Sequence, residues 1–321
     1  TQGEFSQDRT QEAATNPRHW RVPLLIEAGE AQPVRTVMPG SASLPVPGCG
    51  PVIVNGGQLG YFRTLYTPAM LQQLTAALPH FQPIDQVGLI RDNIALATAG
   101  YEPGAPAFDL LAAIPRDANP RVAQNAVDRW SELYDLTPGP DRPTFAAEVR
   151  KLWLPRLEAL GYEPRANEPL PDANLRASLI ATLGKMDDAD VLGQARARFA
   201  RLGSDPHALD GPFKTTWLDI IGRNATETDW RQVMTLAEQT KSPAERATYF
   251  ELLGKARDVP LARKALDFAL TGKAGTTSAA MITNVAAVHP ELAYDFTIAH
   301  RARVEELVDD SGRSQFYRGL I

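Results

Sequence analysis

The pattern of apolar and polar positions changes once along the chain, near residue 65. Before that point, short apolar runs alternate with turns rich in proline and glycine, as at Trp20–Ile26 and Pro33–Met38. Short apolar runs that end at such turns are typical of β-strands. The pattern therefore predicts about four to seven short strands in residues 1–64, folded as a small N-terminal β-sandwich domain.

The apolar residues recur with a helical period after this point. Leu71, Leu74 and Leu78 fall on one face of a helix that the Thr67-Pro68 pair would begin. Similar spacing continues through the rest of the chain. We therefore expect a mainly α protein in which residues 65–321 form a second domain, built of helices.

Glycines lie near several of the expected helix ends. They are Gly100, Gly161, Gly203 and Gly222. Helices often end with a residue in the left-handed conformation, and glycine adopts it at little cost. We expect these four residues to have positive φ angles.

The helical region also contains an internal repeat. Arg176-Ala177 followed by Leu183-Gly184-Lys185 recurs as Arg246-Ala247 followed by Leu253-Gly254-Lys255. A related triplet, Ile221-Gly222-Arg223, lies between the two copies. After each triplet, a short acidic or polar turn leads to a second helical segment. These segments are Leu192–Phe199, Trp230–Ala237 and Leu261–Phe268, with a weaker copy in residues 285–298.

Helix pairs that recur every roughly 32 to 38 residues are typical of α-solenoids of the HEAT or armadillo type. Each pair has an apolar face that only a neighbouring pair can bury. The repeat therefore predicts an α-α superhelix after the small β-sandwich. Solenoids usually bind their ligands on the concave wall.

Composition excludes several classes of function. The net charge is −5 and the isoelectric point is near 5.6, which argues against nucleic acid as a partner. The single cysteine, Cys49, excludes an internal disulfide. No apolar run reaches the roughly 18 residues of a membrane helix. We expect a soluble protein with no membrane span, and both a bacterial-type cytoplasmic location and an exported one stay open.

The histidines do not form a recognisable metal site. They are His19, His80, His207, His289 and His300. A zinc peptidase helix needs the pattern His-Glu-x-x-His, which places two imidazoles one turn apart. No two of these histidines are four residues apart and none is followed by glutamate. We therefore expect no metal, no cofactor and no catalytic residue in this chain.

The most informative segment is VIVNGGQLGYFRTLY, residues 52–66. It predicts a strand that ends at a glycine-rich corner before the first helix. Asn55, Gly56, Gly57 and Gly60 would supply the positive φ angles that such a corner needs. Side chains beyond the corner are placed to hold one domain against the next.

This segment resembles the N-x-G-x-x-G-[YF]-[YF]-R-x-x-Y motif of M1-family zinc aminopeptidases. In that family the motif joins a small β-sandwich to the C-terminal α-helical domain. Further similarity is found in the strand-like segments Thr1–Phe5 and Trp20–Leu24 and in the helix-like segment Gly88–Ala97. The resemblance marks seven candidate interdomain residues: Asn55, Gly60, Tyr61, Arg63, Tyr66, Arg91 and Asp92. Arg63 and Arg91 are the two expected to form a hydrogen bond or an ion pair between domains.

The resemblance implies that the chain is a C-terminal portion of a peptidase whose zinc is bound in a separate catalytic domain. The helical domain would form the wall of a peptide-binding chamber over that domain. Its partners would be the catalytic domains of the same polypeptide and peptide substrates. We expect the chain by itself to be inactive.

Two other interpretations stay open. The repeat alone is equally typical of a stand-alone α-solenoid scaffold that binds a peptide or a protein. A hydrolase that acts through carboxylates would also have acidic residues available, although they form no convergent motif. A His-Glu-x-x-His pattern upstream in the encoding gene would identify the peptidase.

Overall fold

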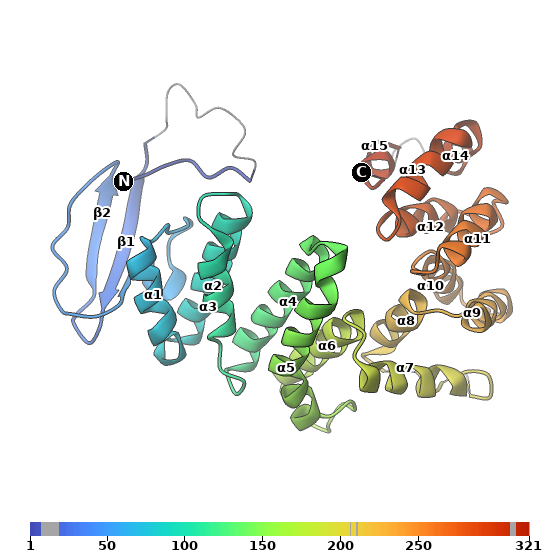
Figure 1. The fold of residues 1–321 in the computed structure, drawn as a ribbon, viewed down its shortest axis with the longest axis horizontal. Coiled ribbons are helices and arrows are strands. Elements are labelled where there is room, and N and C mark those ends of the chain that lie inside the picture. Colours follow the sequence, from blue (N-terminus) through green and yellow to red (C-terminus); the bar gives the residue numbers. More distant parts are fainter. Residues whose placement is uncertain (8–18, 206, 210, 309–312, 321) are drawn as a thin grey trace. The chain divides into compact units, whose positions relative to one another are not determined.

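The computed structural model describes residues 1–7, 19–205, 207–209, 211–308 and 313–320. Helices dominate these residues, and one small sheet lies near the N-terminus (Figure 1). The mainly α class is therefore confirmed. The chain divides into two compact units, Thr1–Thr182 and Leu183–Ile321.

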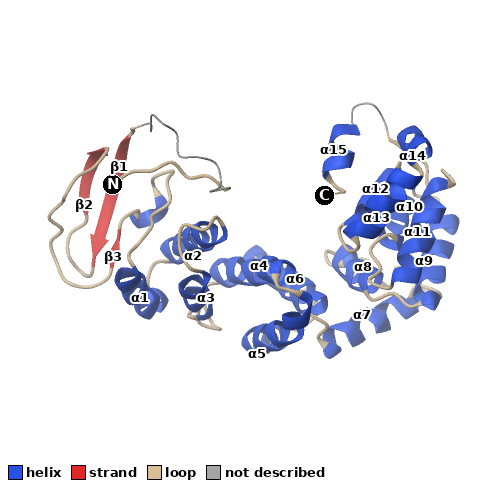
Figure 2. Cartoon of the chain, turned by 45° about the horizontal axis from the view of Figure 1, so that its top comes forward, coloured by secondary structure: helices blue, strands red, loops and turns tan. Residues whose placement is uncertain are grey.

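The sheet of the first unit contains β1 (Arg21–Ala28), β2 (Val34–Pro39) and β3 (Val52–Ile53). The strand order is β2-β1-β3, and β1 is antiparallel to both neighbours (Figure 2). Within the described residues, this single three-stranded sheet replaces the expected sandwich of four to seven strands. Proline and glycine between β2 and β3 prevent further regular pairing there.

The N-terminal segment resembles a strand in sequence but is not paired as one. Gln2 holds it by its side chain: Gln2 Nε2 donates to Trp20 O at 2.7 Å and to Met38 O at 3.0 Å. Trp20 N donates in return to Gln2 Oε1 at 3.0 Å. The expected strand Thr1–Phe5 is therefore wrong, because a side-chain amide takes the place of backbone pairing at the sheet.

The helices of the first unit follow from local sequence signals. Thr67 caps the first of them, since Thr67 Oγ1 accepts the Met70 N–H at 3.3 Å. Gly100 and Gly161 have φ angles of 76° and 74°, as predicted for the ends of the second and fifth helices. The helices are α1 (Pro68–Ala77), α2 (Pro83–Thr98), α3 (Gly104–Ala112), α4 (Pro120–Leu136), α5 (Arg142–Leu160) and α6 (Leu170–Lys185), which continues into the second unit.

Helix α2 lies at the centre of the first unit, in contact with α3, α4 and the corner that precedes α1. Its buried face includes Leu89, Ile90 and Ile94. This position allows α2 to hold the sheet and the helices together.

The second unit is a stack of helix pairs. Its helices are α7 (Ala189–Arg201), α8 (Lys214–Arg223), α9 (Glu227–Gln239), α10 (Pro243–Leu253), α11 (Val259–Leu270), α12 (Thr277–Ala286), α13 (Pro290–Ala299), α14 (Arg301–Leu307) and α15 (Arg313–Arg318). α7, α9, α11 and α13 are the four second helices that the repeat predicts. α8, α10 and α12 pack in succession, while α9 packs on α10 and α11 packs on α12. This arrangement fits an α-solenoid.

The repeated glycines allow close packing of helices. A Cβ atom on Gly184 would lie 2.6 Å from Ile220 Cδ1, and one on Gly222 would lie 2.5 Å from Leu252 Cδ1. On Gly254 it would lie 2.6 Å from the backbone oxygen of Met281. Each glycine therefore lies where the next helix of the stack approaches. Gly222 does not have the positive φ angle that we expected, because helix packing selects glycine at this position.

The same correction applies to Gly203, which also lacks the positive φ angle that we expected.

The described part of the chain contains no helix with both the length and the hydropathy needed to cross a bilayer.

Substitution of Gly254 by alanine tests this close packing. The φ angle of Gly254 is −79°, so alanine causes no backbone strain, and close contacts with Met281 and Asn284 oppose it. We expect Gly254→Ala to lower the free energy of unfolding by about 1–3 kcal/mol. Gly193 is the control, because it is exposed within α7 and a Cβ there meets nothing within 4 Å. Gly193→Ala should raise stability by about 0.5–1 kcal/mol. Equal effects in urea unfolding would contradict the close packing.

Candidate functional site

The corner between the sheet and α1 is closed by the buried side chain of Asn55. Gly60 N donates to Asn55 Oδ1 at 2.8 Å, and Asn55 Nδ2 donates to Gly60 O at 2.9 Å. The amide therefore satisfies both backbone groups of one residue, as a paired strand would. A single 3-10 turn, Gly56–Gln58, lies inside the loop that results.

Only part of the corner has the backbone conformation that the sequence predicts. Gly57 has a φ angle of 65°, and its neighbour Gln58, which was not predicted, has one of 54°. Asn55 has a φ angle of −114°, and neither Gly56 nor Gly60 has a positive one. The expected positive φ angles at these three residues are therefore wrong.

Gly56 and Gly60 are required by close approach instead. A Cβ atom on Gly56 would lie 2.7 Å from Glu27 Oε1 of β1. A Cβ atom on Gly60 would lie 2.1 Å from Phe62 Cε1 and 3.2 Å from Asn55 Oδ1. Any larger residue at either position would displace side chains that the corner packs against.

Two carboxylates of α2 hold the corner by its backbone. Asp85 Oδ1 accepts the Gly57 N–H at 2.7 Å, and Asp92 Oδ2 accepts the Thr64 N–H at 3.1 Å. Asp85 and Asp92 are seven residues apart, so they lie on the same face of the helix. The corner is thus fixed to α2 at two points, one in the turn and one beyond it.

Gly88 completes this face of α2. A Cβ atom on Gly88 would lie 2.0 Å from Gln58 Cδ, so the absent side chain leaves the space that Gln58 occupies. Gln58 Nε2 in turn donates to Asn55 O at 3.2 Å. The corner therefore packs against α2 at Gly88, which lies between the two carboxylates on the same helix face.

Tyr66 ties the end of the corner back to its beginning. Its side chain is buried, and Tyr66 Oη accepts the Val54 N–H at 3.0 Å. Burial raises the pKa of the Tyr66 hydroxyl to about 12, despite the hydrogen bond from the Val54 N–H. Tyr66 is therefore neutral at physiological pH and acts as a fixed structural hydroxyl.

Three of the candidate residues are exposed: Tyr61, Arg63 and Arg91. The Arg63 guanidinium lies 4.2 Å from the centre of the Phe5 ring, which is a cation–π contact. Both arginines lie close enough to Asp92 to lower its pKa, although neither forms an ion pair within the described residues. The interdomain role of Arg63 and Arg91 stays a prediction.

The carboxylates under the corner are held at raised pKa values. Burial raises the pKa of Asp92 to about 6, against the lowering effects of the Thr64 N–H and of Arg63 and Arg91. Burial also raises the pKa of Asp85, and burial together with the charge of Asp85 raises that of Glu27. Asp85 and Asp92 accept hydrogen bonds from backbone N–H groups. Over the described ranges, no three metal-ligating side chains gather into a possible ion site.

Sequence reasoning identified Asp92 but missed Asp85, Gly88 and Gln58. A signal was available, because Asp85 and Asp92 each follow their backbone partner by the same 28 residues. Seven residues of a helix advance about 10.5 Å and seven extended residues about 23 Å, so the equal spacing reflects the turn that shortens the corner between Gly57 and Thr64. Without the structure, however, nothing indicated that α2 lies along the corner.

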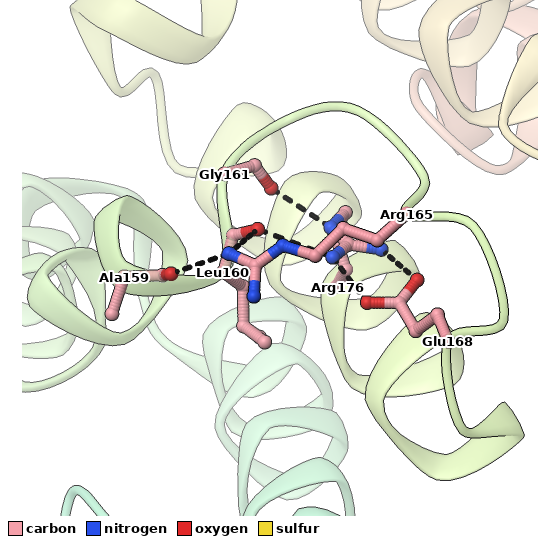
Figure 3. Close-up of polar contacts among 6 residues, drawn as sticks. All are labelled: Ala159, Leu160, Gly161, Arg165, Glu168 and Arg176. Carbon is pink, nitrogen blue, oxygen red and sulfur yellow. Dashed lines mark hydrogen bonds and ion pairs between the residues drawn. The ribbon is translucent and has the colours of Figure 1, made fainter.

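A second polar cluster surrounds Arg176, which lies on α6 and is wholly buried (Figure 3). Arg176 Nε donates to Gly161 O at 2.9 Å, and Nη2 donates to Leu160 O at 3.1 Å. Both oxygens of the Glu168 carboxylate also accept from this guanidinium. The hydrogen bonds from Arg176 are the main reason that the pKa of Glu168 is lowered.

The cluster satisfies the last carbonyl groups of α5. Arg165 Nη2 adds hydrogen bonds to Ala159 O and Leu160 O, both at 2.8 Å. Carbonyls at the end of a helix have no partner within it, and cations are favoured there by the helix dipole. Arg176 and Arg165 therefore cap α5.

The sequence repeat has a corresponding structural role. Arg246, which occupies the repeat position of Arg176, donates to Ala237 O at 3.3 Å and to Thr240 O at 2.6 Å at the end of α9. Arg246 is exposed, whereas Arg176 is buried with a carboxylate. The repeated arginine is thus a cap for the preceding helix in both units.

A glycine-rich corner held by α2, followed by stacked helix pairs, is the architecture that the resemblance to M1 aminopeptidases implies. The sequence matches the ERAP1-like C-terminal domain family over residues 51–321. The chain belongs to this family, and it is a C-terminal region of an M1 aminopeptidase.

Curated relatives agree with this assignment. Aminopeptidase 2 of Candida albicans is 24% identical over 208 residues, which cover 63% of this chain and 22% of the relative. Aminopeptidase M1-D of Oryza sativa subsp. japonica is 22% identical over 240 residues, which cover 71% of this chain and 27% of the relative. The alanine/arginine aminopeptidase of Saccharomyces cerevisiae is 21% identical over 228 residues, which cover 68% and 26%. The chain thus spans about a quarter of the length of these relatives.

The raised pKa of Asp92 predicts a pH-dependent stability. Its pKa is about 6 in the folded protein against 3.8 normally, so the folded state binds more protons than the unfolded state between these values. The free energy of unfolding should therefore fall as pH rises from about 4 to 6. Asp92→Asn should remove this part of the fall in the free energy of unfolding, because an amide does not titrate in this pH range. The amide oxygen can still accept the Thr64 N–H.

Urea unfolding at several pH values between 4 and 7 measures this effect. Asp92→Ala is the comparison, since it lacks the acceptor and should be about 1–2 kcal/mol less stable than Asp92→Asn at every pH. If the free energy of unfolding of Asp92→Asn depends on pH as steeply as that of the unchanged protein, the carboxylate is hydrated in the folded protein.

The two capping arginines should differ in their effect on stability. Arg176→Ala leaves the buried Glu168 carboxylate without its cation and should lower the free energy of unfolding by about 3–5 kcal/mol. Arg246→Ala removes one partly buried and one exposed hydrogen bond and should cost about 0.5–1.5 kcal/mol. Chemical denaturation of both variants makes the comparison. Similar losses would contradict the buried ion pair.

Proposed function

We propose that the chain is the non-catalytic C-terminal portion of a zinc aminopeptidase and forms the wall of a peptide-binding chamber over the catalytic domain. The match to the ERAP1-like C-terminal domain family over residues 51–321 is the observation that carries this proposal. The names of the relatives, all aminopeptidases, support the reaction class.

The zinc belongs to a part of the polypeptide that this chain does not include. None of the five histidines has the spacing of a zinc peptidase helix. In such an enzyme the zinc would supply an activated water for hydrolysis, and a glutamate of the catalytic domain would act as general base. The partners of the chain are then the catalytic domains of its own polypeptide and peptide substrates.

The solenoid would supply the surface of the chamber. In the second unit, α8, α10 and α12 form one layer, and α9 and α11 pack against that layer. One layer of a curved stack necessarily faces inward, so its exposed side chains meet a peptide that enters. A wall of this kind selects substrates by length, because it excludes folded proteins from the catalytic zinc.

The corner would act as the joint between the sheet and the helices. Asn55, Gly60, Tyr66 and Asp92 give it a fixed geometry through backbone hydrogen bonds. Tyr61, Arg63 and Arg91 remain available on its surface for contacts with another domain.

Activity measurements test the proposal. The purified chain should bind no stoichiometric zinc and should hydrolyse no aminoacyl substrate. The full-length product of the encoding gene should contain His-Glu-x-x-His and release amino-terminal residues from peptides. A chelator should abolish that activity. Zinc-dependent turnover by the chain alone, or a full-length product without the motif, would contradict the proposal and favour a stand-alone scaffold.

A further inference from the structure

The outward face of the small sheet has an apolar part, in which Pro23 and Val37 are exposed. Along β1, Leu24 and Ile26 are buried, so the alternate residues Pro23 and Leu25 point to the other face. Val37 of β2 lies directly opposite Pro23 and extends this face onto the neighbouring strand. The sheet is therefore apolar on both sides.

The corner adds a wall to this face. Leu59 is 78% exposed and lines, together with Pro23, Leu25 and Val37, an open hollow of about 570 Å³. Tyr61, two residues further on, is fully exposed. Single exposed apolar residues are normal on proteins, but a continuous patch around a hollow is typical of an interaction site.

Arg35 is the charged residue that lines the hollow, and Arg21 lies on the same face of β1, two residues before Pro23. Glu27 lies further along this face, beside Gly56 of the corner. Within the described residues, neither arginine side chain has an ion pair or a hydrogen bond. A partner with apolar side chains and carboxylates would therefore satisfy this surface.

We propose that this face, which we call the outer sheet face (Pro23, Leu25, Arg35, Val37 and Leu59), binds an acidic and apolar surface of the catalytic region in the same polypeptide. This inference rests on the proposed function. The matched segments make up only 22% and 27% of two relatives, so a large part of such a polypeptide is available to cover the face.

A second copy of the chain is a poorer occupant. In a symmetric dimer the same patch of both copies forms the interface. The outer sheet face would then bring Arg21 and Arg35 of one copy close to the same arginines of its partner. Like charges at an interface oppose association, and no acidic side chain lines the hollow to offset them.

Cysteine labelling tests the proposal. The exposed Cys49 is first replaced by Cys49→Ser, and any cysteine elsewhere in the full-length product is replaced by serine as well, so that one introduced cysteine is the only thiol. Val37→Cys and Leu59→Cys report on the outer sheet face, and Leu136→Cys, 67% exposed at the end of α4, is the matched control. Reaction rates with a small maleimide are compared in the chain by itself and in the full-length gene product.

We expect all three cysteines to react at similar rates in the chain by itself. In the full-length product, the rates at positions 37 and 59 should fall at least tenfold relative to position 136. Adding Arg35→Glu should restore a several-fold faster reaction at position 59, because a carboxylate there repels an acidic partner. Rates at positions 37 and 59 that match the control in the full-length product would overturn the proposal.

Two further outcomes are distinguished. If positions 37 and 59 become protected in the chain by itself as its concentration rises, a second copy is the occupant and the proposal is wrong. The peptidase assay separates this inference from the proposed function. An active peptidase with unprotected cysteines overturns the docking alone. Protected cysteines in a product without peptidase activity overturn the proposed function and, with it, the assignment of the covering surface to a catalytic region.

Discussion

Backbone groups that leave regular secondary structure must find hydrogen-bond partners, and this constraint determines where polar side chains are buried in this protein. At the corner, Asp85 and Asp92 accept the N–H groups of Gly57 and Thr64. At the end of α5, Arg176 donates to free carbonyls. Carboxylates accept hydrogen bonds from the backbone N–H groups, and guanidinium groups donate hydrogen bonds to the backbone carbonyls. Such contacts join the corner to α2 in addition to the apolar packing of Leu89, Ile90 and Ile94.

The same constraint explains the internal repeat. A helix pair in a solenoid exposes the carbonyl end of one helix where the next begins, and an arginine at a fixed position of each copy can cover it. Arg176 and Arg246 do so in the two units, with different burial. The repeated glycines have a separate role, because they let consecutive helices of one layer approach until backbone and side chain touch. Capping and close packing together define the repeating element.

The corner and the solenoid have distinct places in the proposed enzyme. The corner contains no nucleophile, and its carboxylates contact backbone, so it fits a joint better than a reaction centre. Its surface beside the sheet combines an apolar hollow with two arginines that lack partners among the described residues. A region that binds neighbouring domains needs such a surface, whereas the chemistry requires a metal site that the histidine spacing here does not provide.

The sequence by itself determined the class of the fold, because helical periodicity and the repeat are set by residues that lie close together in the sequence. It also determined the family, through the corner motif, and the positions of the second helices at α7, α9, α11 and α13. Only the tertiary structure decided that Gly56, Gly60 and Gly222 serve close approach instead of positive φ angles, and that Arg176 is buried while Arg246 is exposed. These properties depend on residues far apart in the chain, and local periodicity contains no information about which distant segments meet.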